Sequence, residues 1–435
     1  MTKTPSNELT RRGFISHSSA ALGATAFGPF ILRGQNLNSK VNVAAIGAGG
    51  KGSSDTDNNA RCGANIVALC DVDLGRLRAR GEKYPGAATY QDFRKMLEKE
   101  KSIDAVSVST PDHMHAVAAI TAMKMGKHVY VQKPLTQSVY EARLMRKGAT
   151  EQKVATQMGN QGHAGEGTRQ IREWIDAGVI GTGREVQYWT NRPIWPQAVD
   201  RPTDAHHAPP GLDWDLFLGP ARHRPYHPAY HPFRWRGWWD YGTGALGDIA
   251  CHSMDAAFWA LELDQPTRIE AETTPLFAET APAVCRITYE FPARGSRPPV
   301  RFVWRDGDLA MPRPPQLVNG ERLPGGSSGQ LFVGDDGVIG ADMYAREPQV
   351  FPATLHRDVI ASPPPPRYPR SPGVYLEWIE ACKGNGTAGS SFPDHSGPLT
   401  EVVLLGNLAV RTGQAIEWDA KQMRATNVPE ATAFL

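Results

Sequence analysis

The chain has 435 residues, and a typical domain size of ~150 residues predicts two or three domains. Its 47 Lys and Arg residues against 45 Asp and Glu residues leave a formal charge of +2, which is too weak a field to indicate a nucleic-acid partner. Hydrophobic residues form 40% of the chain, enough for a sizeable core, and this excludes a disordered protein. The 5 cysteines are scattered without a CxxC pair, so neither a disulfide framework nor a structural zinc site is expected.

Residues 1–38 read as a leader. The twin Arg11-Arg12 precedes an Ala/Gly-rich stretch at 20–30 that is too short and too weakly hydrophobic to span a ~30 Å bilayer core. The pattern resembles a bacterial twin-arginine (Tat) export signal, which implies the Tat translocase as a partner and a periplasmic or otherwise exported protein. A disordered basic tail is the alternative. No other segment resembles a membrane helix, so no transmembrane anchor is expected.

A glycine-rich turn follows the first apolar run, 41–46, which has the character of a buried strand. The turn matches GxGxxG. In such a turn the first glycine permits a tight bend, the second lets a pyrophosphate approach the backbone, and the third lets helix and strand pack closely. The sequence therefore predicts a dinucleotide site at Gly47, Gly49, Gly50 and Gly52.

A second apolar strand, 65–70, ends at Asp71. A carboxylate at this point can accept the adenosine ribose hydroxyls and repels a 2′-phosphate, which favours NAD over NADP. A purely structural acidic residue is the alternative. Strands at 103–109 and 128–131 then alternate with helical stretches at 92–99 and 116–125, which predicts a doubly wound parallel sheet. Ligands of such sheets bind beyond the carboxyl ends of the strands.

Four features together resemble the Gfo/Idh/MocA oxidoreductase family. They are the glycine turn, Asp71, Thr110-Pro-Asp-His-Met-His115 and Gln132-Lys133-Pro134. The resemblance implies an N-terminal Rossmann domain, at 39–157. It also implies a substrate-binding α+β domain with a large, mostly antiparallel open sheet, at 158–435. It extends through Gly159–Gly162 and Gly397–Glu401. The cofactor contacts implied beyond the glycines and Asp71 are Thr110, Pro111, His115, Gln132 and Asn160.

The family's usual Glu-Lys-Pro reads Gln132-Lys133-Pro134 in this chain. The lysine that carries the catalytic role is retained as Lys133, whereas Gln132 removes a charge near the nicotinamide. The resemblance to a Tat signal implies export of the folded protein. NAD is made in the cytoplasm and is not readily recharged outside it, so we expect the NAD to be bound tightly enough to travel with the protein.

Asp248 and His252 follow a glycine-rich segment and are four residues apart, so on a helix they share one face with Cβ atoms ~5–6 Å apart. Two structural alternatives exist, because Asp248 can cap the helix and His252 can be a satisfied core histidine. The spacing is the one at which the family carries its acid/base pair. With Lys133, these residues are the expected catalytic set.

The segment 226–241 is dense in aromatic rings with interleaved arginines. Aromatic faces stack on sugar rings and arginines can hydrogen-bond hydroxyl groups. We predict that Arg236, Trp238, Trp239 and Tyr241 line the substrate pocket; the alternative is a loop held by hydrophobic burial.

His223, His227 and His231 also recur every fourth residue. Prolines interrupt the run, which argues against a helical metal site, and no metal is expected. With His206 and His207 added, a metal site is the alternative. Strand patterns follow at 283–291 and 300–305, and Pro/Gly-rich insertions are predicted at 311–329 and 362–372.

The leading hypothesis is hydride transfer between a carbohydrate or polyol carbinol carbon and the nicotinamide of NAD. A first alternative is an exported glycosidase that uses tightly bound NAD in a transient C3 oxidation followed by elimination. A second alternative is a non-catalytic NAD-bound sugar sensor. Members of this family commonly pair subunits through the open sheet, so a homo-oligomer is expected.

Overall fold

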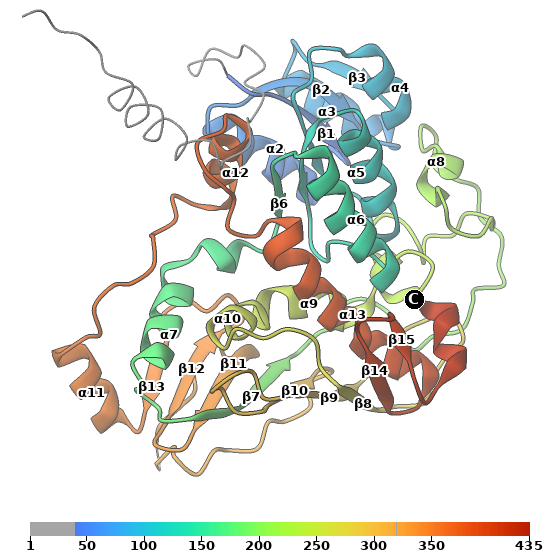
Figure 1. The fold of residues 1–435 in the computed structure, drawn as a ribbon. Helices are drawn as coiled ribbons and strands as arrows, with labels where there is room; N and C mark the ends of the chain where they lie inside the picture. Colours follow the sequence, from blue (N-terminus) through green and yellow to red (C-terminus); the bar gives the residue numbers. More distant parts are fainter. Residues whose placement is uncertain (1–39, 319) are drawn as a thin grey trace, which may run out of the picture. The chain divides into compact units, whose positions relative to one another are not determined.

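The computed structural model describes residues 40–318 and 320–435, so the predicted leader lies outside the described residues. Two sheets with helices between and around them make up this part of the chain (Figure 1). No helix among the described residues is long and apolar enough to cross a membrane.

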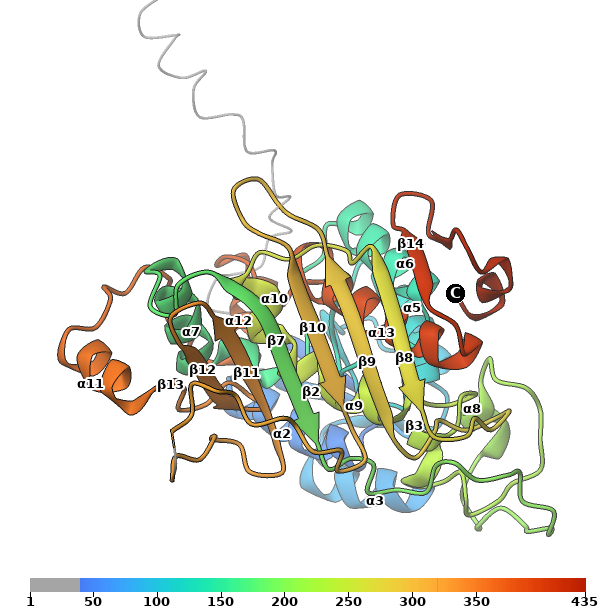
Figure 2. The same cartoon turned by 90° about the horizontal axis from the view of Figure 1, so that it is seen from below.

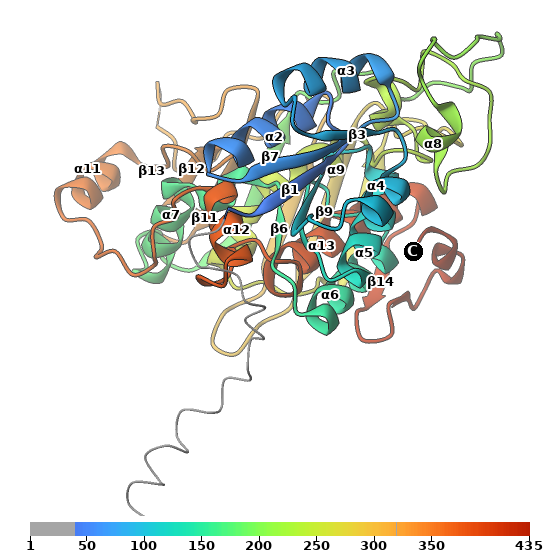
Figure 3. The same ribbon diagram turned by 90° about the horizontal axis from the view of Figure 1, so that it is seen from above.

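The first sheet is six-stranded, all parallel, and ordered β3-β2-β1-β4-β5-β6. Its central strand β1 is almost wholly buried, as expected for a strand covered on both faces. Figure 3 shows the helices of this domain lying around the sheet. The strands are β1 (Asn42–Ile46), β2 (Asn65–Cys70), β3 (Ala88–Tyr90), β4 (Ala105–Val108), β5 (His128–Val131) and β6 (Thr156–Met158).

Five helices connect these strands, and local capping fixes several of their starts. Asp73 and Asp92 accept backbone N–H groups at the starts of α3 and α4, and Ser138 forms a capping box with Glu141 at α6. The helices are α2 (Lys51–Arg61), α3 (Leu74–Lys83), α4 (Phe93–Lys99), α5 (His115–Lys124) and α6 (Val139–Gln152). The late helix α12 (Val374–Cys382) adds Trp378 to the core cluster that contains Val43 of β1.

The second sheet is nine-stranded and ordered β13-β12-β11-β7-β10-β9-β8-β14-β15 (Figure 2). Its pairs are antiparallel except for β10 with β7. The strands are β7 (Gly183–Thr190), β8 (Arg268–Thr273), β9 (Cys285–Phe291), β10 (Val300–Arg305), β11 (Ser328–Gly334), β12 (Val338–Asp342), β13 (Gln349–Phe351), β14 (Ile416–Asp419) and β15 (Arg424–Ala425). The predicted fold class, a parallel Rossmann sheet followed by a mostly antiparallel open sheet, is confirmed.

Helices cover the inner face of this sheet, where alternate residues of β9 are buried. The helix α13 contacts β8 and α9. The helices of this half are α7 (Glu166–Asp176), α8 (Trp214–Leu218), α9 (Gly244–Ser253), α10 (Asp255–Ala260), α11 (Ala353–Ala361) and α13 (Gly397–Thr412). Met254 separates α9, which carries Asp248 and His252, from α10.

Candidate active site

A cavity of about 880 Å³ is lined by residues from both halves of the molecule. Loops at the carboxyl ends of the parallel strands form one wall, as the Rossmann topology requires. The other wall is formed by the segment 231–236 and by three residues of the later part of α9, Asp248, Ile249 and His252. Of the residues predicted from the sequence, the cavity is lined by Gly47, Gly49, Gly50, Asp71, Thr110, Pro111, Gln132, Lys133, Arg236, Asp248 and His252.

The glycine turn has the geometry that a phosphate-binding loop needs. A Cβ on Gly47 would lie 2.8 Å from the backbone of Ser109, and one on Gly52 would lie 1.7 Å from the carbonyl oxygen of Gly47. Gly52 therefore serves helix packing and does not line the cavity. Helix α2 begins directly after Gly50, and no side chain caps its N-terminus. Its first N–H groups are therefore available to an anion.

Asp71 joins the glycine turn to the end of β2. Its Oδ2 atom accepts the Gly49 N–H at 2.8 Å, and its Oδ1 atom accepts the Asp73 N–H at 3.0 Å. Burial raises the pKa of this carboxyl, against the opposing effect of the two backbone donors. Asp71 thus shapes the loop while its carboxylate faces the cavity.

Gln132 is held by a buried carboxylate that the sequence reasoning did not single out. Its Nε2 atom donates to Asp55 Oδ2 at 2.9 Å, and Ser109 Oγ donates to the same oxygen at 2.8 Å. The other oxygen of Asp55 accepts from Tyr375 at 2.7 Å and pairs with Lys51. A glutamate at position 132 would face this carboxylate, so the amide is the residue that fits.

Lys133 and Asp248 form a direct ion pair across the cavity. The Lys133 ammonium donates to the Asp248 backbone carbonyl at 2.7 Å and to its Oδ1 atom at 2.8 Å. Arg236 donates to the same Oδ1 atom at 3.3 Å. These two cations, with Lys133 the larger influence, outweigh burial and lower the pKa of Asp248 to about 2. Asp248 is therefore a carboxylate committed to Lys133 and Arg236.

The predicted pairing of Asp248 with His252 is not what the structure contains. The Nδ1 atom of His252 is buried with no hydrogen-bond partner, and the ring lies 4.9 Å from that of Tyr344. The reason is electrostatic, because two full positive charges compete for the Asp248 carboxylate better than a neutral imidazole does. Burial, and then the charge of Lys133, lowers the pKa of His252 to about 3. The imidazole is thus neutral at physiological pH.

A further carboxyl group, Asp112, lines the cavity. It is buried, and its Oδ2 atom accepts from the Thr243 hydroxyl at 2.7 Å. Burial raises its pKa to about 7, and the charges of Arg236 and Lys133 only partly oppose this rise. The sequence displays Asp112 within the Thr110–His115 motif, but nothing there distinguishes it from its neighbours.

Besides Gly52, two residues predicted to contact the cofactor do not line the cavity. His115 is buried, and its two ring nitrogens contact the carbonyl oxygens of Pro134 at 2.8 Å and Thr110 at 3.0 Å, so it ties two cavity loops together. Asn160 is also buried and donates to Asp255 at 2.7 Å. The polar atoms of both side chains thus form hydrogen bonds with protein groups.

The aromatic segment divides between core and cavity. Trp238 and Tyr241 are buried in an aromatic cluster with Tyr230, and Trp239 lines a separate small cavity beside Gln137. The prediction that these three residues face the substrate cavity is therefore wrong, and the alternative of a loop held by burial describes them. The driving force is the large apolar area that each ring removes from water.

Other residues of the same segment do line the cavity. Trp235 and Phe233, which is 45% exposed, are aromatic residues of this segment that line the cavity. Their ring centroids lie 4.3 and 4.6 Å, respectively, from the central guanidinium carbon of Arg236. The sequence density of rings indicated the right segment but not the orientation of each ring. Tyr344 and Arg192 also line the cavity, from loops that carry no sequence signal.

Comparison with known proteins agrees with this architecture. Residues 41–160 match the Gfo/Idh/MocA model "Oxidoreductase family, NAD-binding Rossmann fold", and residues 168–297 match "Oxidoreductase family, C-terminal alpha/beta domain". The chain belongs to the Gfo/Idh/MocA oxidoreductase family. The first domain is therefore of the NAD-binding Rossmann type.

Two characterised relatives are named sugar or polyol dehydrogenases. D-Glucoside 3-dehydrogenase of Escherichia coli is 29% identical over 229 residues, which cover 52% of this chain and 55% of that protein. Inositol 2-dehydrogenase/D-chiro-inositol 3-dehydrogenase of Lacticaseibacillus casei is 31% identical over 144 residues, 33% of this chain and 41% of that protein. The matched stretch thus spans less than half of the inositol dehydrogenase.

Solved structures show the same fold over a larger part of the chain. The WlbA dehydrogenase of Bordetella pertussis, in complex with NADH and UDP-GlcNAcA, has a TM-score of 0.59 at 18% identity and covers 88% of this chain and 99% of that one. Levoglucosan dehydrogenase, in complex with NADH and levoglucosan, has a TM-score of 0.58 at 16% identity, covering 87% of this chain and 99% of that one.

Proposed function

We propose that this chain is an NAD-dependent dehydrogenase that oxidises a carbinol carbon of a sugar or polyol, with Lys133 and His252 acting on the reacting hydroxyl. The observation that carries the proposal is that the glycine turn, Lys133 and His252 line one and the same cavity, of about 880 Å³. Its size falls within the ~300–1,000 Å³ range of ligand pockets. Family membership and the names of the relatives agree with this reaction class.

The residues at the Rossmann end of the cavity fit a dinucleotide. The uncapped start of α2 supplies N–H groups for a pyrophosphate, and the Cβ atoms that Gly47 and Gly52 lack would block the turn. The Asp71 carboxylate suits ribose hydroxyls. When bound, NAD supplies the hydride acceptor at C4 of its nicotinamide.

His252 suits the task of accepting the hydroxyl proton. Burial lowers the pKa of His252, so its imidazole is neutral and one ring nitrogen has an open lone pair that can accept a hydrogen bond from the substrate hydroxyl. Its Nδ1 atom has no partner, so no neighbouring group restricts the tautomer. Asp248 acts on His252 through charge only, because its hydrogen bonds go to Lys133 and Arg236.

Lys133 suits the task of holding the substrate oxygen. An ammonium has three N–H donors, and Asp248 accepts two of them, at its carbonyl and carboxylate oxygens. The third remains for the substrate oxygen, where it stabilises the negative charge that develops as hydride leaves. Arg236 fixes Asp248 from the other side and so acts as a positioning residue.

The test is to denature the purified protein, quantify the released NAD(H), and assay NADH formation against a panel of glucosides, inositols and anhydrosugars. We expect NAD(H) to be retained and at least one of these classes to be oxidised. A folded protein that binds no NAD and oxidises none of them contradicts the proposal.

A second candidate function rests on one comparison. A glycosyl hydrolase family 109 protein of Solibacter usitatus is 28% identical over 195 residues, 42% of this chain and 44% of that protein. In this alternative the same oxidation is transient and leads to elimination of the glycosidic bond. Release of phenol from an aryl glycoside without net NADH favours the glycosidase, and net NADH favours the dehydrogenase.

We also propose that the protein is exported, on the strength of Arg11 and Arg12 in the leader. Cell fractionation tests this, because replacing both arginines by lysine should retain the protein in the cytoplasm.

We further propose a homo-oligomer that pairs through the nine-stranded sheet, whose outer face is free of helices in the described part of the chain (Figure 2). Light scattering gives the mass of the particle.

A further inference from the structure

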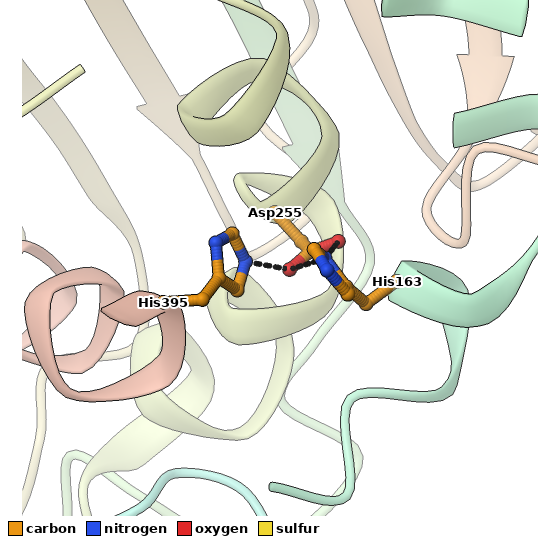
Figure 4. A group of neighbouring side chains, drawn as sticks. All are labelled: His163, Asp255 and His395. Carbon is orange, nitrogen blue, oxygen red and sulfur yellow. Dashed lines mark hydrogen bonds and ion pairs between the residues drawn. The ribbon is translucent and has the colours of Figure 1, made fainter. Parts of the chain in front are cut away.

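Three buried side chains outside the cavity converge on one point (Figure 4). The Asp255 carboxylate lies 3.0 Å from His163 Nδ1 and 2.6 Å from His395 Nε2. All three residues are buried, and their ligand-type atoms lie within 4.8 Å of one another. None of them lines the active-site cavity.

The three residues come from segments that are distant in sequence. His163 lies in the 3-10 turn η2 (Gln161–Ala164), Asp255 opens α10, and His395 lies in the π-helical turn η4 (Phe392–Ser396). Short π-helical segments occur often at functional sites. Packing alone does not require two imidazoles and a carboxylate to meet in a fully buried place.

Asn160 adds a fourth group with an unsatisfied atom. Its amide nitrogen lies 2.7 Å from Asp255 Oδ1, while its own Oδ1 is buried with no hydrogen-bond partner. The two ends of an amide have nearly the same shape, and the hydrogen-bond network decides which end points where. Turned over, the amide would present its oxygen to the Asp255 oxygen, and this contact is favourable only if a cation lies between them.

We propose that His163, Asp255, His395 and the Asn160 side-chain oxygen hold a divalent transition-metal ion of the zinc type. Two imidazoles with oxygen donors suit zinc and its first-row neighbours, whereas calcium and magnesium prefer all-oxygen sites. A divalent ion compensates the buried Asp255 charge. Four ligands and no opening to the cavity make this a structural ion.

The surroundings of His163 agree with ligation through Nδ1. Ligation there requires the proton on Nε2, and metal-bound histidines commonly donate that proton to a carboxylate. His163 Nε2 and Glu377 Oε2 lie 3.3 and 3.4 Å from the point that a Cβ on Gly389 would occupy. The Glu377 carboxylate and the Nε2 edge of the His163 ring therefore both border Gly389.

The ion would connect the end of the Rossmann domain, helix α10 and the turn before α13. Asp255 is the first residue of α10 and lies three residues after His252, near the end of α9. The ion would therefore fix the junction between these two helices, next to the proposed catalytic imidazole. Loss of the ion is expected to lower the melting temperature of the protein more than it lowers the rate of the reaction.

A second group of potential ligands provides an internal control. Asp204 lies 2.7 Å from His206 and 3.1 Å from His227, but Asp204 and His206 are exposed. Exposed acidic groups of this kind are common without a bound ion. The variant H206Q/H227Q removes this surface pair without altering the buried group.

The experiment measures metal content and thermal stability of the full-length protein. Protein purified from zinc-supplemented cells is analysed by inductively coupled plasma mass spectrometry, stripped with dipicolinate, and reloaded with Zn²⁺ or Co²⁺. We expect one ion per chain in the wild type and in H206Q/H227Q, and its loss in Asp255→Asn and His395→Gln. Stripping should lower the melting temperature, and Zn²⁺ should restore it.

The wild type alone decides the matter if the variants do not fold. Co²⁺ in a site with two imidazoles gives visible ligand-field absorption bands, and competition with Zn²⁺ should abolish them. A wild type that purifies without metal, and whose melting temperature and spectrum respond to neither ion, overturns the proposal. So does a metal that is lost in H206Q/H227Q and retained in His395→Gln. Either result would leave the cluster as a hydrogen-bonded triad.

Discussion

The ammonium of Lys133 donates to both the carbonyl oxygen and the carboxylate of Asp248, at 2.7 and 2.8 Å, and so joins the end of strand β5 to helix α9. One contact thus sets the distance between the Rossmann domain and the residues that follow Asp248 on α9. It also leaves His252, one helical turn later, with a neutral ring and no competing hydrogen bond at Nδ1.

Replacement of Lys133 by alanine is expected to lower kcat by a factor of ~10²–10³, the loss typical of one donor to a developing oxyanion. NAD binding should persist, since the glycine turn and Asp71 remain. Steady-state kinetics and calorimetric titration with NAD measure the two effects. The matched control is Lys124→Ala on the exposed end of α5, which should behave as wild type. Equal turnover in both variants would remove Lys133 from the reaction.

Asp71→Ala is expected to weaken NAD binding about tenfold or more, since a hydrogen bond involving a charged group contributes ~1.5–3 kcal/mol. The carboxylate both orders the Gly49 N–H and faces the cavity. Calorimetric titration of the stripped protein gives the dissociation constant. An unchanged constant would mean that the cofactor does not contact this end of the cavity.

Gln132→Glu is expected to destabilise the protein by roughly 1–3 kcal/mol, because a second carboxylate would face Asp55 in a buried place. In the double variant Asp55→Asn with Gln132→Glu the two roles are exchanged, and part of the lost stability should return. Urea denaturation of the two single variants and the double variant closes a mutant cycle. Additive losses would show that the two side chains do not interact.

The stability of the wild type is expected to fall as pH rises through 7, because of Asp112. Its folded-state pKa of about 7 lies above the ordinary value of 3.8, so the neutral form stabilises the fold and this contribution is lost on ionisation. Asp112→Asn stays neutral at every pH. Its unfolding free energy should therefore gain roughly 1–3 kcal/mol relative to wild type between pH 5 and pH 8. A constant difference, like that expected for the exposed Asp264→Asn, would contradict the buried ionisation.

Phe233→Ala is expected to raise KM for the sugar several-fold while the melting temperature stays near that of the wild type, because this ring is half exposed and lines the cavity. Trp238→Phe is the converse control. It removes apolar volume from a closed aromatic cluster, so it should lower the melting temperature and leave KM unchanged. A raised KM in Trp238→Phe, with an unchanged melting temperature, would instead indicate that Trp238 lines the substrate cavity.

Sequence reasoning predicted the parallel sheet and the glycine turn because these depend on local patterns: apolar strands, a fixed glycine spacing and an acid at the end of β2. It did not predict β7, an inner strand of the nine-stranded sheet, because its buried face consists only of Val186, Tyr188 and Thr190, too short an alternation to stand out in the sequence.

In the site, spacing along one helix suggested that Asp248 orients His252, but the nearer partners of Asp248 come from β5 and from the aromatic segment. Such partners depend on tertiary contacts that no spacing encodes. The same holds for Asp55, which meets Gln132 only once α2 and β5 are packed together, and for the buried histidines around Asp255.

The most direct test of the central claim is a crystal structure of the protein with NADH and a sugar or polyol identified by the dehydrogenase screen. The account predicts that one substrate oxygen accepts from Lys133 Nζ and contacts a ring nitrogen of His252, each within the ~2.6–3.2 Å of a hydrogen bond. A ligand whose hydroxyl groups approach only one of these two side chains, with the other turned toward protein, would contradict it.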